Sequence, residues 1–95
     1  MKTNLSKNYN KLTPSEKRLL RLEYIKQQDN KCWFCKNDLN EKPSKEIAEK
    51  FLNLGLFPKG FLNSPIHLQH DHKTGLTEGA VHAYCNGILW QYFNK

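Results

Sequence analysis

Two pairs of metal-binding side chains limit what this 95-residue chain can fold into more than any other feature. Cys32 and Cys35 stand three positions apart, and about fifty residues later His82 and Cys85 repeat that spacing. Three thiolates with one imidazole suit a closed, tetrahedral structural zinc site. This set uses all three cysteines of the chain, which indicates a reducing, intracellular environment. The alternative is three buried apolar cysteines and an unrelated histidine.

The length of the chain allows one domain with a small core. At this size folding buries roughly 60–65% of the surface that the unfolded chain exposes, so a bound metal would add needed stability. No apolar run approaches the ~20 residues of a membrane span, and the N-terminus lacks the hydrophobic segment of a signal peptide. We therefore expect one zinc-stabilised domain that is not associated with a membrane.

Positive charge is concentrated at the N-terminal end of the chain. Residues 1–36 contain nine Lys and Arg against three Asp and Glu, whereas residues 37–95 contain six of each sign, so the first part carries the whole net charge of +6. A basic segment on an otherwise neutral chain is typical of proteins that bind the phosphate backbone of nucleic acids. A solvated helix face explains the charge equally well.

The basic N-terminal part divides into an arm and a helix. Residues 1–12 are polar and without periodicity, which predicts a mobile basic arm before a single domain over residues 13–95. Thr13, Pro14 and Glu16 predict a helix start with a capping box, and the helix should end near residue 28. Its apolar stripe, which we expect to pack in the core, consists of Leu19, Leu20, Leu22 and Ile25.

Residues 37–66 have the pattern of an insertion after the first cysteine pair. Ser44 is expected to cap a short helix that runs through about Leu54 and stops at Gly55. The side chains expected to face inward from this helix are Ile47, Ala48, Phe51 and Leu52.

The C-terminal part has the pattern of a β-hairpin followed by a helix. Residues 66–70 alternate as a strand does, and residues 79–82 supply a possible partner strand. A short helix is expected after Asn86. The order of elements predicts an α+β fold in which an N-terminal helix, a zinc-binding loop and a helical insertion precede the hairpin and the last helix.

A second polar cluster lies between and beside the ligand pairs. Its members are His67, Gln69, His70, Asp71, His72 and Asn86. An imidazole with a pKa near ~6.5 can take a proton from water at neutral pH, and phosphodiester cleavage also needs a cation on the phosphate oxygens. Hard cations prefer oxygen ligands, which Asn86, Gln69 and Asp71 can supply. A second metal-binding role for the histidines, or a purely structural histidine cluster, explains these residues too.

In combination these motifs resemble the core of the HNH (ββα-metal) nucleases, and most closely the branch of phage recombination endonuclease VII. The matching segments are the first cysteine pair, His67-Leu68-Gln69-His70-Asp71-His72, Thr74-Gly75, Gly79 and His82-Ala83-Tyr84-Cys85-Asn86. They lie within roughly residues 27–36 and 66–90, a little over a third of the chain.

The resemblance implies a ββα-metal domain that acts as a divalent-metal-dependent endonuclease on the phosphodiester bonds of duplex or branched DNA, by nicking or by cleaving. The implied ligands of a structural Zn²⁺ are Cys32, Cys35, His82 and Cys85. His70 would be the general base, His72 would help to position the phosphate, and Asn86 would bind the catalytic Mg²⁺ or Mn²⁺. The basic helix and arm would hold the DNA backbone.

Three positions depart from the family pattern. His82 replaces a cysteine and remains a sound zinc ligand. Gln69 stands where the family has an aspartate ligand of the catalytic ion, so its neutral amide should bind Mg²⁺ less tightly, and Asp71 or His67 is a candidate substitute. Glu78 replaces a common arginine and reverses the charge of a phosphate contact. The alternative functions are therefore a catalytically weakened HNH fold that binds nucleic acid or protein, and a zinc-ribbon-like binding domain.

Overall fold

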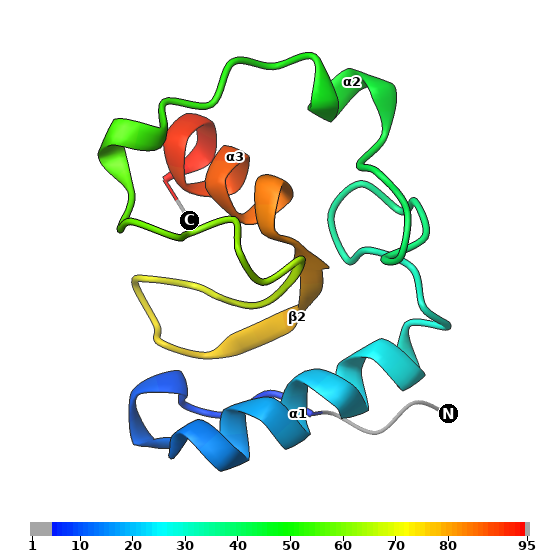
Figure 1. The fold of residues 1–95 in the computed structure, drawn as a ribbon. Helices are drawn as coiled ribbons and strands as arrows, with labels where there is room; N and C mark the ends of the chain where they lie inside the picture. The colour runs from blue at the N-terminus through cyan, green and yellow to red at the C-terminus, as the bar shows by residue number, and fades with distance from the viewer. Residues whose placement is uncertain (1–4, 95) are drawn as a thin grey trace.

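The computed structural model describes residues 5–94 and shows a two-stranded antiparallel hairpin between two helices (Figure 1). The hairpin pairs β1 (Ile66–His70) with β2 (Thr77–His82), and it is packed between α1 (Pro14–Gln27) and α3 (Ala83–Phe93). Short helices complete the fold: η1 (Tyr9–Lys11), α2 (Lys45–Ala48) and η2 (Leu54–Leu56). The predicted α+β class and order of elements are confirmed. In the described part, no helix is long and apolar enough to cross a membrane.

The start of α1 follows the predicted capping box. The Thr13 hydroxyl accepts a hydrogen bond from the Glu16 amide at 3.1 Å, and the Glu16 carboxylate accepts one from the Thr13 amide at 2.9 Å. These two bonds satisfy backbone donors that the first turn of a helix leaves without partners. Pro14 occupies the first helical position, where its missing N–H costs nothing.

Only one side of α1 packs against the rest of the domain. Leu20 and Tyr24, one helical turn apart, are buried against the hairpin. Leu19 and Leu22 were expected in the core, but they are 55% and 50% exposed. The narrow two-stranded hairpin contacts a single helix face, which explains why the predicted apolar stripe is only partly buried.

The insertion contains much less helix than predicted. α2 is a single turn, and the chain then extends so that Leu52 can bury its side chain against α3. The partner there is Gly87: a Cβ atom at that position would lie 2.8 Å from a Leu52 methyl carbon. Phe51 was expected to face inward but is 72% exposed. Packing against α3 therefore overrides the local helix signal.

Residues 5–12, the described part of the predicted arm, lie along the end of β2 next to the hairpin turn. The Thr77 amide donates to the Lys7 carbonyl at 2.8 Å, and the Tyr9 amide donates to the Gly75 carbonyl at the same distance. An isolated bridge joins Asn8 to Leu76. The first four residues of the predicted arm lie outside the described residues.

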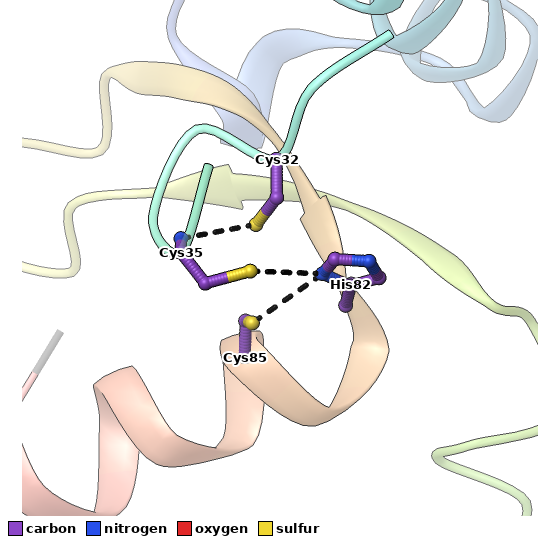
Figure 2. A group of neighbouring side chains, drawn as sticks. All are labelled: Cys32, Cys35, His82 and Cys85. Carbon is purple, nitrogen blue, oxygen red and sulfur yellow. Dashed lines mark hydrogen bonds between the residues drawn. The ribbon is translucent and has the colours of Figure 1, made fainter. Parts of the chain in front are cut away.

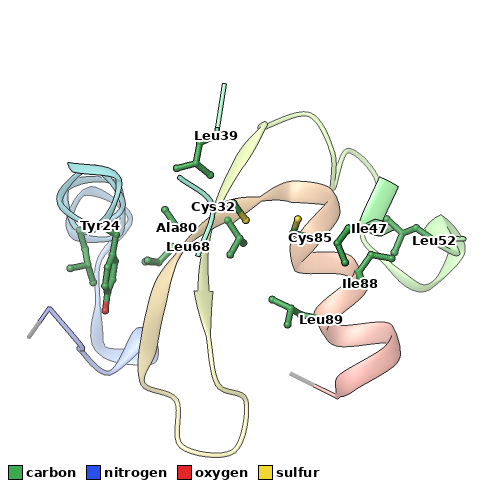
Figure 3. Packing of buried hydrophobic residues seen from close by; sticks show 12 residues of the cluster. Tyr24, Cys32, Leu39, Ile47, Leu52, Leu68, Ala80, Cys85, Ile88 and Leu89 are labelled. Atoms are coloured by element: carbon green, nitrogen blue, oxygen red, sulfur yellow. The ribbon is translucent and has the colours of Figure 1, made fainter. Parts of the chain in front are cut away.

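The core joins all the main elements around the hairpin (Figure 3). It includes side chains from α1, both strands, α3, the insertion and the loop that carries the first cysteine pair. The buried members are Leu20, Tyr24, Cys32, Leu39, Ile47, Leu52, Leu68, Ala80, Val81, Cys85, Ile88 and Leu89. Two of these are cysteines of the predicted zinc site, so that site is continuous with the core.

Candidate functional site

The two predicted ligand pairs come together at one end of the hairpin (Figure 2). Cys32 and Cys35 lie on the loop after α1, His82 ends β2, and Cys85 lies in the first turn of α3. Their ligand atoms all lie within 4.8 Å of one another, and the three cysteines form no disulfide. This cluster connects the loop after α1 to the junction of β2 and α3, which lies about fifty residues later in the sequence.

The spacing within the cluster fits a tetrahedral zinc ion. Nδ1 of His82 lies 3.4 Å from Sγ of Cys35 and 3.5 Å from Sγ of Cys85. Zn–S bonds of about 2.3 Å and Zn–N bonds of about 2.0 Å would place neighbouring nitrogen and sulfur ligands about 3.5 Å apart. The donor set and its spacing can therefore hold a structural Zn²⁺ with little rearrangement.

A backbone contact orients the imidazole of the cluster. The other ring nitrogen of His82, Nε2, lies 2.9 Å from the carbonyl oxygen of Asp38. A carbonyl can only accept, so Nε2 carries the proton and Nδ1 presents its lone pair to the three sulfurs. Histidine ligands of metals commonly donate their second N–H to a carbonyl or carboxylate in this way.

The thiols of the cluster compete for protons. A hydrogen bond from Cys85, opposed by burial, lowers the pKa of Cys32 well below its ordinary value. The same hydrogen bond, together with burial, raises the pKa of Cys85. One thiolate is thus stabilised at the expense of its neighbour, and a cation that binds all the sulfurs would remove this competition because metal ligation requires thiolates.

A second group of predicted residues borders a groove of about 500 Å³, here called the basic groove. It extends between α1, β1 and the start of α3. The side chains that matter for its chemistry are Tyr9, Lys17, Arg21, His67, His70 and Asn86. The structure therefore brings together the predicted base and one predicted metal ligand, with two cations beside them.

Aromatic and cationic neighbours surround His70. Its ring stacks on Tyr9 with centroids 3.9 Å apart and planes 10° apart, and Lys17 Nζ lies 4.0 Å from the centre of the same Tyr9 ring. Burial, followed by the positive charges of His72 and Lys17, lowers the pKa of His70. Within residues 5–94 neither ring nitrogen of His70 has a hydrogen-bond partner, so a neutral imidazole can accept a proton there.

Asn86 is held by a histidine of β1. Its amide Nδ2 lies 3.0 Å from Nδ1 of His67, which places the amide as donor and leaves Oδ1 as the oxygen for other contacts. Burial lowers the pKa of His67, which favours the neutral ring that this hydrogen bond requires. Asn86 directly follows Cys85 in α3, so the cysteine cluster also fixes the turn that carries Asn86.

Gln69 and the other polar residues of the hairpin have different surroundings. Gln69 does not line the basic groove: it is 1% exposed, its Nε2 donates to the His70 carbonyl, and its Oε1 has no hydrogen-bond partner. Oδ1 of Asp71 accepts from the amides of Lys73 and Thr74 in the hairpin turn. Asp71 is thus engaged in the turn.

A β-bulge separates Gln69 from His70 in their pairing with β2. Gln69 pairs with Gly79 and His70 pairs with Thr77, so Glu78 is the extra residue between them. Its carboxylate lies 3.4 Å from Nε2 of Gln69. Bulges change the direction of neighbouring side chains, and here the bulge lies directly beside the predicted base.

A second groove, of about 280 Å³, adjoins the basic groove. It is called the aromatic groove because aromatic rings form much of its lining. Its lining residues are Leu56, Phe57, Pro58, Phe61, His70, His72, Asn86 and Trp90. The predicted phosphate-positioning residue, His72, therefore lies on this side of His70. His70, Asn86 and Phe61 line both grooves.

Sequence reasoning did not single out four residues of this region. Lys17 and Arg21 stand four positions apart on α1, a spacing that signals a shared helix face. Trp90 stands four positions after Asn86 on α3 and carries the same signal. No sequence signal could have placed Tyr9 against His70, because that contact spans sixty residues and depends on how the N-terminal segment pairs with β2.

The comparisons with known proteins identify no relative of this chain. Neither the family models, nor the curated proteins, nor the solved structures contain a match to this chain. The described structure is a small α+β fold with a hairpin, a following helix and a Cys/His cluster that can hold zinc.

Proposed function

We propose that this protein is a metal-dependent endonuclease of the HNH (ββα-metal) type that hydrolyses DNA phosphodiester bonds. The observation that carries the proposal is the meeting of His70 and Asn86 in one groove with Lys17 and Arg21. A proton acceptor, an oxygen ligand and two cations are the groups that such a reaction requires. The hairpin followed by a helix, with a Cys/His cluster at their junction, is the arrangement expected of the family.

His70 is the proposed general base. Its lowered pKa keeps the imidazole neutral at pH 7, and its ring nitrogens are free of protein partners within the described chain. It would take a proton from the attacking water as the new phosphorus–oxygen bond forms and the bond from phosphorus to the leaving sugar oxygen breaks, and the leaving oxygen would take a proton from solvent. The stack on Tyr9 would hold the ring in place during this transfer. His72, beside it in the aromatic groove, would help to position the phosphate.

Lys17 and Arg21 are the proposed contacts to the DNA backbone. Neither forms an ion pair with a described residue, so their charges remain available to an anion. Both lie on the face of α1 that borders the groove, close to the proposed base. Phosphate contacts of this kind supply affinity without sequence preference, and they weaken as salt rises.

The proposed ligands of a catalytic divalent ion are Asn86 and Gln69. Asn86 has Oδ1 free of the His67 contact. Oε1 of Gln69 has no hydrogen-bond partner, but Gln69 is buried outside the groove, so its side chain would have to turn toward Asn86 to share an ion. A bound Mg²⁺ or Mn²⁺ would stabilise charge on the phosphate oxygens. Because both donors are neutral amides, we expect weak binding of Mg²⁺.

The cysteine cluster has a structural role in this proposal. Four protein ligands leave zinc no open position for substrate or water. The cluster would instead fix the start of α3 against the end of β2, and thereby hold Asn86 at a constant distance from the proposed base. Zinc would thus support catalysis because it fixes the position of Asn86, the residue that follows Cys85.

The test is nicking of supercoiled plasmid by the zinc-loaded protein with Mg²⁺, with Mn²⁺ and with no added divalent ion. We expect metal-dependent nicking that His70→Ala reduces at least about a hundredfold, within the range that a general base contributes. A matched control is Arg18→Gln, which changes a charge on α1 outside the groove. Undiminished nicking by the His70→Ala protein would refute its role as base.

A second candidate function is a catalytically weakened HNH fold that binds nucleic acid or protein. The observation in its favour is the lack of any carboxylate among the residues that line the basic groove. Gln69→Asp separates the two functions. It should increase nicking if the protein is an enzyme with a poor metal site, and it should have no effect on a protein that only binds.

A further inference from the structure

Apart from His70, His72 and Asn86, the residues that line the aromatic groove have no part in the chemistry proposed above. Its wall is formed by three rings: Phe57 stacks on Phe61 with centroids 4.5 Å apart, and it meets Trp90 edge to face at 5.4 Å. Trp90 remains 40% exposed although it is part of this cluster. The groove is therefore lined by a partly exposed indole ring, and the neighbouring phenyl rings hold that ring in place.

The size of the groove limits its occupant. Pockets for drug-sized ligands begin at about 300 Å³, and this groove measures about 280 Å³. One planar ring system fits that volume, whereas a folded partner does not. The polar atoms of His70, His72 and Asn86 can contact the edge of such a ring, while the other lining residues are apolar or aromatic.

The two grooves differ in character: the basic groove is bordered by cations, and the aromatic groove is lined mainly by rings. Lys17 and Arg21 border the basic groove, whereas the residues that line the aromatic groove include no Lys, Arg, Asp or Glu. His70 and Asn86 stand at the boundary and line both. A molecule that occupies both grooves across this boundary must carry negative charge at one end and a flat apolar ring at the other. A nucleotide within a nucleic acid has this character.

We propose that the aromatic groove binds one unstacked nucleobase of a single-stranded nucleic acid whose adjacent phosphate lies in the basic groove. Trp90 is the stacking platform. The inference rests on the proposed function, and it specifies the substrate: bases of a duplex are stacked and paired, so a single-stranded segment reaches the groove without the cost of unstacking. Every base has a flat face, so this contact carries little sequence preference.

The position of Trp90 on α3 supports this assignment. It stands one helical turn after Asn86, so both side chains project from the same face of the helix toward the grooves. Phe61 lines both grooves and packs edge to face on His67, the residue that holds Asn86, with centroids 4.9 Å apart. The base platform and the proposed metal ligand are thus parts of one packed unit.

The experiment compares two single-stranded oligonucleotides with equal numbers of phosphates, one of thymidines and one of abasic tetrahydrofuran units. Binding to the zinc-loaded protein is measured by fluorescence anisotropy with no added Mg²⁺ or Mn²⁺. We expect the thymidine strand to bind about 5- to 150-fold more tightly, the range for stacking of one base on an aromatic side chain. Trp90→Leu should bring this ratio close to one without changing the salt dependence that the phosphate contacts produce.

Phe93→Leu is the matched control, because Phe93 is another exposed ring of α3, 55% exposed and outside the groove. It should retain the wild-type ratio. Equal affinity of the wild-type protein for the two strands would overturn the proposal, and that comparison needs no variant to fold. An unchanged ratio in a zinc-loaded Trp90→Leu protein would overturn it as well, leaving a peptide segment as the candidate occupant.

Plasmid nicking separates failure of the inference from failure of the proposed function. Nicking by a protein that binds both strands equally would refute the base site and leave the endonuclease standing. Base-dependent binding that requires Trp90, in a protein that cleaves neither the plasmid nor a circular single-stranded DNA with either metal, would refute the endonuclease and retain the base site in a protein that binds single strands.

Discussion

Removal of zinc should unfold this domain. The cluster connects the loop after α1, the end of β2 and the start of α3, and two of its members, Cys32 and Cys85, belong to the main core. Residues 28–44, all of them described, contain no helix or extended strand that would hold the loop by itself. Loss of the metal would leave three thiols and an imidazole in the interior without their common partner.

Two free energies give the loss of stability that is expected when zinc is removed. A domain of this length should have a total stability of about 5–14 kcal/mol, from about 0.05–0.15 kcal/mol per residue. Structural zinc sites contribute about 10–16 kcal/mol in zinc-finger peptides at pH 7. Because the zinc contribution is comparable with the whole stability, the protein without metal should be largely unfolded at 25 °C.

The assay is thermal unfolding, followed by circular dichroism in buffers of fixed free Zn²⁺ concentration. Above saturation each tenfold increase in free zinc adds about 1.4 kcal/mol to the folded state. That increment should raise Tm by about 6–11 °C in a domain of this size. Elemental analysis should give one zinc per chain.

A ligand variant supplies the matched comparison. Cys35→Ala removes one sulfur from the cluster and should lower Tm and zinc affinity together, whereas Asn37→Ala, an exposed change in the same loop, should alter neither. A Tm that does not depend on free zinc, or a metal-free protein with an unchanged circular dichroism spectrum, would refute the assignment of this cluster as a structural metal site.

Three further predictions concern the basic groove. Arg21→Gln should weaken DNA binding and reduce the slope of log affinity against log salt by about one, while Arg18→Gln, outside the groove, should change the slope less; equal effects would contradict the assigned face. Because the pKa of His70 is lowered from its ordinary value of 6.5, nicking should fall on the acid side with a midpoint below 6.5, at pH values where circular dichroism shows the protein still folded. A midpoint above 6.5 would contradict a lowered pKa for the proposed base. Gln69→Asp should lower the Mg²⁺ concentration needed for half-maximal nicking by about tenfold, equivalent to about 1.4 kcal/mol, and an unchanged requirement would remove this position from the metal site.

Local signals predicted the parts of the fold that depend on a few neighbouring residues. The capping box at Thr13 forms because its partner lies three residues away, and both of its hydrogen bonds are present. β1 has the predicted bounds, but β2 begins at Thr77, two residues earlier than expected. The earlier start comes from the bulge, because Thr77 pairs with His70 once Glu78 is left out of the register.

Local sequence patterns gave wrong predictions where a contact with a distant segment determines the local structure. The predicted helix after Ser44 is one turn long because Leu52 gains more from burial against Gly87 than from another helical turn. Residues 5–12 look unstructured by composition, yet their backbone groups pair with the end of β2. Such pairings depend on the path of the chain through space, and short-range patterns carry no trace of them.

The sequence alone determined which side chains can bind zinc, because the chemistry of thiolates and imidazole and the spacing of two pairs are properties of the chain. It also determined that a basic helix precedes them. The tertiary structure decided the rest: which nitrogen of His82 faces the sulfurs, that Tyr9 stacks on His70, and that Trp90 opens into a groove beside Asn86. The physical reason is that residue type and spacing act locally, whereas burial, stacking and groove shape come from contacts between segments far apart in the chain.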